Sequence, residues 1–168
     1  ICDGMGGRNA GEVASGLAVE IIQKHMTDAH KTDALPLIGA VNDKLSPQTN
    51  RLASAVRLAN QVVNGASQSK PVQSGMGTTV VCALLNGPML SVAHAGDSRM
   101  YLVRGENIHA LTADHSLVAE QVRQGIITEE QAEKSVQKNI VTRALSVEDT
   151  LQIDLDEIEL AKGDAILL

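Results

Sequence analysis

The stretch TTVVCALLNGPMLSVAHAGDSR, residues 78–99, decides the fold. It contains two short runs rich in Val, Leu and Ala, and Asn86-Gly87-Pro88 between them is typical of a tight turn. Because each run is apolar almost without a break, we expect two antiparallel strands that are covered on both faces. Further β-prone runs follow, and together they predict an antiparallel meander. The expected strands are residues 78–85, 89–95, 99–103 and 107–111.

Helical patterns precede this sheet. Apolar residues at alternating spacings of three and one predict amphipathic helices over residues 10–25 and 52–63. Asn64-Gly65 is typical of a helix C-terminus, so we expect the second helix to end there. A shorter helix is predicted within residues 35–45, and a loop over residues 67–74.

Helical patterns return after the meander, at residues 117–124 and 128–135, the second opened by a capping box at Thr128 and Gln131. Residues 151–160 alternate between apolar and polar with a shift of phase, which predicts a bulged strand. The order of helices and strands indicates a single α+β domain over residues 1–168. Since both ends lie inside apolar strand patterns, we expect this span to belong to a longer polypeptide and to be incomplete at both termini.

Composition narrows the function classes. The chain has 168 residues, a net charge of −6 and no long basic run, which argues against nucleic acid or an anionic membrane surface as a partner. No stretch reaches the roughly 20 apolar residues of a membrane span, and no signal peptide is visible, so we expect a cytoplasmic protein. We also expect it to be a monomer. Cys2 and Cys82 lack the CxxC spacing of a zinc site, and we expect both to be plain buried thiols.

The first candidate site is Asp3-Gly4-Met5-Gly6-Gly7, between a predicted strand and a predicted helix. The glycines allow a close backbone approach to an ion or a phosphate. Asn9 excludes the dinucleotide fingerprint, and no Gly-Lys-Ser/Thr follows as in a P-loop. A carboxylate beside a glycine carbonyl suits a hard cation such as Mg²⁺ or Mn²⁺. The alternative is an ordinary Asp-Gly turn.

The second candidate is Gly96-Asp97-Ser98-Arg99, which we place at the tip of a hairpin between two apolar strands. There Asp97 would project from a rigid scaffold toward a metal. The alternative is a plain turn in which Ser98 and Arg99 are merely solvated. We interpret His94 as a hydrogen-bonded core or edge histidine, and His115 as a cap of the following helix without an acid–base role.

Five motifs in a fixed order resemble the type 2C metal-dependent (PPM) Ser/Thr protein phosphatases, in particular the compact bacterial members, and the resemblance spans the whole chain. The motifs are the glycine-rich opening from Ile1 to Ser15, Gly75-Met76-Gly77-Thr78-Thr79, Gly96-Asp97-Ser98-Arg99, Thr112-x-Asp114-His115-Ser116 and Val141-Thr142-Arg143-Ala144-Leu145.

The resemblance implies a fold and a mechanism. The fold would be an antiparallel two-sheet β-sandwich flanked by α-helices, in an α-β-β-α order. Asp3 would bridge two Mn²⁺ or Mg²⁺ ions, Gly4 would lend its backbone carbonyl to one of them, and Asp97 would help hold a third. A hydroxide bridging the metals would then hydrolyse phospho-Ser or phospho-Thr on proteins, opposing a Ser/Thr kinase. Residues 121–139 would form the flap beside the active site.

Departures from the family pattern leave alternatives open. The phosphate-binding arginine of the family would lie before Ile1, and its remaining metal aspartates would follow Leu168, so the 168 residues alone would be a weak metal binder and an inactive fragment. Ser146 replaces a glycine that is frequent after the fifth motif. The chief alternative is a catalytically inactive pseudophosphatase that binds phosphoproteins or regulates a partner, and a third is a phosphatase for anti-sigma-factor antagonists.

Overall fold

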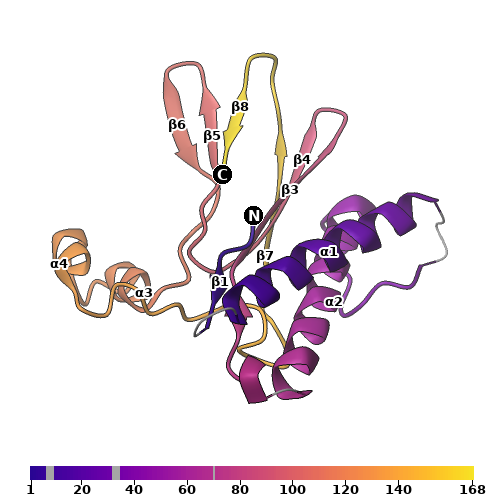
Figure 1. Cartoon of the computed structure of the whole chain (residues 1–168). Helices are drawn as coiled ribbons and strands as arrows, with labels where there is room; N and C mark the ends of the chain where they lie inside the picture. Colours follow the sequence, from indigo (N-terminus) through magenta and orange to yellow (C-terminus); the bar gives the residue numbers. More distant parts are fainter. Residues whose placement is uncertain (7–9, 32–34, 70) are drawn as a thin grey trace.

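The structure is a computed structural model that describes residues 1–6, 10–31, 35–69 and 71–168. Two long helices lie against one three-stranded sheet, and a second three-stranded sheet stands beside the first (Figure 1). Two short helices, α3 and α4, lie apart from the long pair. The predicted α+β class with antiparallel sheets is confirmed.

The helices are α1 (Ala10–Lys31), α2 (Pro47–Ser69), the 3-10 turn η1 (Pro71–Gln73), α3 (Leu117–Arg123) and α4 (Glu129–Lys134). The strands are β1 (Gly4–Met5), β2 (Gly77–Thr78), β3 (Val80–Asn86), β4 (Met89–Ala95), β5 (Tyr101–Arg104), β6 (Asn107–Ala110), β7 (Asp154–Glu159) and β8 (Ala165–Leu167). They form a small β1-β2 sheet and two larger sheets, ordered β3-β4-β7 and β6-β5-β8.

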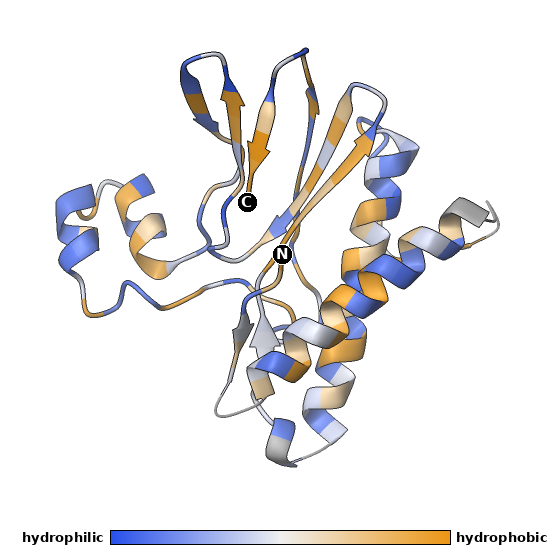
Figure 2. Cartoon of the chain, turned by 45° about the horizontal axis from the view of Figure 1, so that its top comes forward, coloured by the Kyte–Doolittle hydropathy of each residue, from blue (hydrophilic) through white to orange (hydrophobic). Residues whose placement is uncertain are grey.

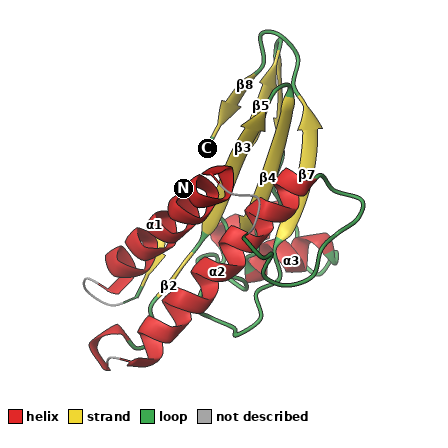
Figure 3. Ribbon diagram, turned by 90° about the vertical axis from the view of Figure 1, so that its right-hand side faces the viewer, coloured by secondary structure: helices red, strands yellow, loops and turns green. Residues whose placement is uncertain are grey.

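The main core lies between the two long helices and the β3-β4-β7 sheet (Figure 3). Alanines recur every four residues along α1 at Ala10, Ala14 and Ala18, and all three are buried. They pack with buried Ala55 and Ala59 of α2, and such small side chains allow two helices to approach closely. A chain without Phe or Trp thus fills its core by close helix packing.

A second core lies between the two larger sheets. It joins Val81, Leu90 and Val92 of the first sheet to Met100 and to Ile166 of the second. The strand β4 is therefore covered on both faces, as predicted, whereas β3 is buried only at its start and Leu85 near its end is 63% exposed. Apolar residues follow β3 and β4 in Figure 2, whereas α4 is mostly hydrophilic and has no buried residue.

The prediction of a single meander is wrong. β4 and β5 follow each other in sequence but lie in different sheets, and the downstream strands β7 and β8 complete the two sheets. The predicted bulge is also absent, because β7 pairs with β4 in an unbroken register. The phase shift has another cause: Leu155 packs into the helix-side core, whereas Ile158 packs into the core between the sheets.

Three helix predictions also need correction. α1 continues past His25 to Lys31, and α2 runs through Asn64-Gly65 to Ser69, so part of the predicted 67–74 loop is helical. The Asn64 side chain donates to the Asp149 carboxylate instead of capping a helix. Residues 35–45 form no helix, since Gly39 has a φ of +82° and the carbonyls beside it accept hydrogen bonds from Arg57.

Candidate metal centre

The glycine-rich opening is tied to the second motif. The backbone of Asp3 is held from both sides, since its N–H donates to Thr79 Oγ1 at 3.0 Å and its carbonyl accepts from the Thr79 N–H and the Thr78 hydroxyl, each at 3.0 Å. Gly4 then starts β1, which pairs with β2. Gly7 and Asn9 lie outside the described residues.

The requirement for glycine at position 4 comes from the fold itself. A Cβ on Gly4 would lie 1.9 Å from the carbonyl oxygen of Gly11, in the first turn of α1. A Cβ on Gly11 would in turn lie 2.7 Å from the Gly4 carbonyl oxygen. The close backbone approach that the glycines were predicted to allow is therefore an approach of Gly4 to α1. This contact fixes the position of the peptide that follows Asp3.

The third motif is a crossover between the sheets rather than the tip of a hairpin. Gly96 has a φ of +122°, and a Cβ there would lie 2.6 Å from side-chain carbons of Thr79. Ser98 is not merely solvated, because its hydroxyl lies 2.7 Å from Thr79 Oγ1. Arg99 forms a two-pronged ion pair with Asp114, at 2.8 and 2.6 Å.

Thr79 therefore links the segments that carry the two candidate carboxylates. Its hydroxyl bonds to the peptide of Asp3 and to the side chain next to Asp97. Asp3 is exposed and Asp97 half-buried, and within the described residues neither carboxylate has a hydrogen-bond or ion-pair partner. Two free carboxylates and a glycine carbonyl are oxygen donors of the kind that Mg²⁺ and Mn²⁺ prefer, so the donor set fits a hard divalent cation.

The fourth and fifth motifs close a ring of hydrogen bonds. His115 exchanges two hydrogen bonds with Gly96, and its carbonyl accepts from the N–H of Thr142 at 2.8 Å. Leu145 in turn exchanges two backbone hydrogen bonds with Thr78, at 2.9 and 3.3 Å. The five motifs, which are spread over most of the chain, thus meet at one place in the fold.

Next to this ring lies a partly buried polar cluster that sequence reasoning missed. The His94 and His115 rings stack with centroids 4.6 Å apart, and His115 Nε2 lies 3.1 Å from the Asp154 carboxylate. Arg143 also pairs with Asp154, at 3.1 Å. Asp154 gave no local signal, because it lies 39 residues from His115 and reaches it only through the pairing of β7 with β4.

The structure corrects one part of each histidine interpretation: His94 is a core histidine but lacks the predicted hydrogen bond, and His115 does not cap the following helix. His94 is only 1% exposed, yet neither ring nitrogen has a hydrogen-bond partner among the described residues. Burial, and secondarily the nearby His115, lower the pKa of His94 to about 4, so the ring is neutral at physiological pH. The cap of α3 is Ser116, whose hydroxyl accepts from the N–H of Ala119, while His115 points into the interior.

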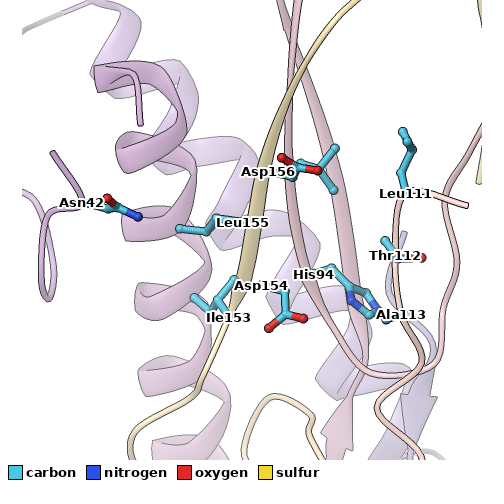
Figure 4. A pocket seen from close by; sticks show the side chains of 10 residues that line it. Asn42, His94, Leu111, Thr112, Ala113, Ile153, Asp154, Leu155 and Asp156 are labelled. Carbon is cyan, nitrogen blue, oxygen red and sulfur yellow. The ribbon is translucent and has the colours of Figure 1, made fainter. Parts of the chain in front are cut away.

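A cavity of about 450 Å³ opens beside this cluster (Figure 4). His94, Asp154 and Thr112 line it, together with Asn42 from the connection between α1 and α2. Figure 4 shows the His94 ring beside Ala113, with the Asp154 side chain on the neighbouring strand. The lining includes neither Asp3 nor Asp97, so among the described residues the cavity and the two candidate ligands are separate features.

Comparison with known families identifies this arrangement. The family model described as protein phosphatase 2C matches residues 1–147. The chain belongs to the protein phosphatase 2C family. Its type 2C fold, expected from the five motifs, is confirmed by solved structures of bacterial members.

Bacterial phosphatases are among the relatives of this phosphatase 2C chain. It is 37% identical to protein phosphatase PhpP of Streptococcus pneumoniae serotype 2 over 169 residues, which cover 100% of the chain and 63% of the relative. It is 36% identical, with the same coverage, to serine/threonine phosphatase stp of Listeria monocytogenes serotype 4b. The chain therefore spans 63% of the length of the curated relatives that it matches.

Two solved structures of phosphatase 2C proteins are similar over 98% of the chain. The serine/threonine phosphatase PstP/Ppp of Mycobacterium tuberculosis has a TM-score of 0.81 at 32% identity, and the chain covers 64% of it. The catalytic domain of PstP in complex with two manganese ions has a TM-score of 0.75 at 33% identity, and the chain covers 63% of it.

The segment 121–139, which we expected to be the flap of a phosphatase 2C domain, includes the end of α3 and all of α4. The capping box of Thr128 and Gln131 is confirmed. α4 has no buried residue, and the apolar side chains of Ile126 and Val136 are 63% and 100% exposed. The segment thus packs loosely on the rest of the domain.

The cysteines of this phosphatase 2C chain are half-buried free thiols. Desolvation raises the pKa of both, that of Cys82 to about 11, so neither is a thiolate at neutral pH. In the part of the chain that the structure describes, no helix has the length and apolar character needed to span a membrane.

Proposed function

We propose that the full-length protein is a metal-dependent phosphatase that hydrolyses phospho-Ser and phospho-Thr on proteins. The observation that carries the proposal is the ring of hydrogen bonds joining the five motifs, in which Thr79 holds the backbone of Asp3 and the side chain of Ser98, the neighbour of Asp97. Both carboxylates remain without partners among the described residues. Free carboxylates held by a rigid backbone are better suited to bind a metal than to form structural ion pairs.

Each residue has a defined role in this proposal. The Asp3 carboxylate and the Gly4 carbonyl hold two Mn²⁺ or Mg²⁺ ions, and Asp97 holds a third more weakly. When bound, the ions activate water and neutralise phosphoryl oxygens, which is the chemistry that phosphate ester hydrolysis needs. Thr78 and Thr79 keep the Asp3 backbone in place. The raised pKa of Cys82 agrees with a reaction that needs no thiolate nucleophile.

The proposed substrates are phosphoproteins made by a Ser/Thr kinase, and the proposed setting is a cytoplasmic monomer. The names of the relatives, a protein phosphatase and a serine/threonine phosphatase, support this substrate class. The exposed segment 121–139 carries apolar side chains in solvent, which suits contact with an extended protein substrate.

The experiment measures phosphate release by the full-length protein from a phospho-Thr peptide and from p-nitrophenyl phosphate. Activity should require Mn²⁺ or Mg²⁺, disappear in EDTA and return when the metal is restored. Asp3→Asn should reduce turnover at least about 100-fold, because even the outer partners of metal ligands are worth about 10–100-fold.

The matched control is Glu106→Gln, which removes an exposed carboxylate in the turn between β5 and β6. Glu106 lies beyond the opposite end of β5 from Asp97, away from the candidate ligands, so the control should keep full activity. Turnover that survives chelation, or that is equal in the wild type and Asp3→Asn, would refute the metal mechanism. An inactive protein that still binds phosphopeptides would favour the pseudophosphatase alternative.

A further inference from the structure

Gly96, the residue before Asp97, is held on both sides by one histidine. The N–H of His115 donates to the Gly96 carbonyl at 2.8 Å, and the N–H of Gly96 donates to His115 Nδ1 at 3.1 Å. We call these two hydrogen bonds the His115 clamp. Thr79 packs against Gly96 from another side, where a Cβ on the glycine would lie 2.6 Å away. The peptide that carries Asp97 is thus confined between Thr79 and His115.

The clamp fixes the tautomer of His115. Because the Gly96 N–H is a donor, Nδ1 must be the acceptor, and the ring proton therefore resides on Nε2. Nε2 lies 3.1 Å from Asp154 Oδ2, which accepts that proton in a hydrogen bond. Arg143 Nη1 donates to the other carboxylate oxygen at 3.1 Å. Arg143 Nη1 also lies 3.2 Å from His115 Nε2, but a guanidinium only donates and cannot bond to a protonated Nε2. Asp154, which Arg143 holds in place, is therefore the group that favours the form of the imidazole that can accept from Gly96.

The same cluster could be taken for a metal site, since His94, His115 and Asp154 place ligand atoms within 4.8 Å of one another. Two observations argue against a metal. His115 Nδ1 already accepts from the Gly96 N–H, which leaves only Nε2 for a cation. The guanidinium of Arg143 lies 3.2 Å from Nε2 and 3.1 Å from the Asp154 carboxylate, so a positive charge already occupies this position. The stacked ring of His94 instead supports the face of His115.

We propose that His115 is a positioning residue for Asp97, with its tautomer set by Asp154, which Arg143 holds in place. The proposal rests on the proposed function, in which Asp97 holds the weakly bound metal ion. His115 acts through the peptide of Gly96 and touches neither the metal nor the substrate. Partners of this outer kind tune metal affinity by orienting the ligands.

The test compares His115→Asn with His115→Gln in the full-length protein. Asn places an amide oxygen where the imidazole has Nδ1 and keeps the acceptor for Gly96, whereas Gln has no acceptor there and keeps only a donor toward Asp154. Nitrogen-15 NMR of the metal-free wild type should show the Nε2–H tautomer of His115. The Gly96 amide should exchange slowly in the wild type and His115→Asn, and at least about 10-fold faster in His115→Gln.

The second readout is the Mn²⁺ concentration that gives half-maximal hydrolysis of p-nitrophenyl phosphate. It should rise about 10-fold in His115→Gln and stay within about threefold of wild type in His115→Asn, on the scale of outer-partner effects. In an Asp97→Ala background, His115→Gln should add no further loss, because the clamp acts through the Asp97 carboxylate. A merely structural role would lower activity in both backgrounds.

The proposal would be overturned by an Nδ1–H tautomer, by equal exchange of the Gly96 amide in the two variants, or by additive losses with Asp97→Ala. If His115→Gln does not fold, Asp154→Asn replaces it, since that side chain is 49% exposed, and it should raise the Mn²⁺ requirement in the same direction. An unchanged Mn²⁺ requirement there also overturns the clamp. An inactive wild type refutes the phosphatase function instead, whereas the NMR comparison tests the clamp without any activity.

Discussion

Ser146 combines two local costs that a single substitution should relieve. Among the described residues it is the only non-glycine residue with a positive φ, at 74°. Its Oγ is buried and has no hydrogen-bond partner there. Its backbone N–H donates to Asn60 Oδ1 at 2.8 Å, so the strained backbone is held by a tertiary hydrogen bond. Glycine, which is frequent at this position in the family, would fit the same backbone without strain.

The magnitude follows from these two costs. A left-handed backbone costs a non-glycine residue about 1–2 kcal/mol, and the greater freedom of unfolded glycine offsets about 0.5–1 kcal/mol of this. A buried hydroxyl without a partner costs about 1–3 kcal/mol, and we take about 1 because Ser146 is only half-buried. Ser146→Gly should therefore raise the free energy of unfolding by about 1.5 kcal/mol, and Ser146→Ala by about 1 kcal/mol.

The assay is urea unfolding of the full-length protein, followed by far-UV circular dichroism, which reports the long helices α1 and α2. Ser146→Ala removes the hydroxyl but keeps Cβ, so it separates the hydroxyl from the backbone strain. The reasoning is refuted if Ser146→Gly is no more stable than the wild type, or if the alanine variant is the more stable of the two.

Three further predictions follow from the same contacts. Gly96→Ala should lower the free energy of unfolding in urea by more than about 2 kcal/mol, because the new Cβ would meet Thr79. The control Gly105→Ala, at a φ of +61° with open space around it, should lower it by about 1 kcal/mol. Equal losses in the two variants would contradict the close packing at Gly96. Substitutions within residues 121–139 should lower kcat/KM on a phosphoprotein more than on p-nitrophenyl phosphate, and parallel losses would show that the segment is only structural. Cys82 has a pKa of about 11 in the folded protein and 9.0 in the unfolded chain, so it should resist iodoacetamide at pH 9 until urea is added. For the same reason, the free energy of unfolding should fall as the pH rises from 9 to 11. Equal alkylation rates with and without urea would contradict the burial of this thiol.

Much of the fold was predictable because its signals are local. The apolar runs around Asn86-Gly87-Pro88 gave the β3-β4 hairpin, and the alanine stripe gave α1. Partner strands are not a local property, so sequence placed Gly96-Asp97 in a hairpin although β5 pairs with β8, from the far end of the chain. The predicted helix end at Asn64-Gly65 was wrong for a similar reason, because the Asn64 amide donates to the distant Asp149 carboxylate and the helix continues.

The candidate site divides in the same way. Asp3, Gly4 and Asp97 stand in motifs whose residue types match hard-cation chemistry, so sequence alone could nominate them. The links between them could not be predicted, because Thr79 joins motifs 76 and 19 residues away through tertiary hydrogen bonds. Asp154 had no motif at all and enters only because β7 lies beside β4.

The most direct test of the central claim is a crystal structure of the full-length protein grown with Mn²⁺, with anomalous scattering measured at the manganese edge. We expect two ions bound by the Asp3 carboxylate, one of them about 2.1 Å from the Gly4 carbonyl oxygen, and a weaker third ion on Asp97. Strong manganese peaks elsewhere, for instance at His94 and Asp154, with none at Asp3 would contradict the account.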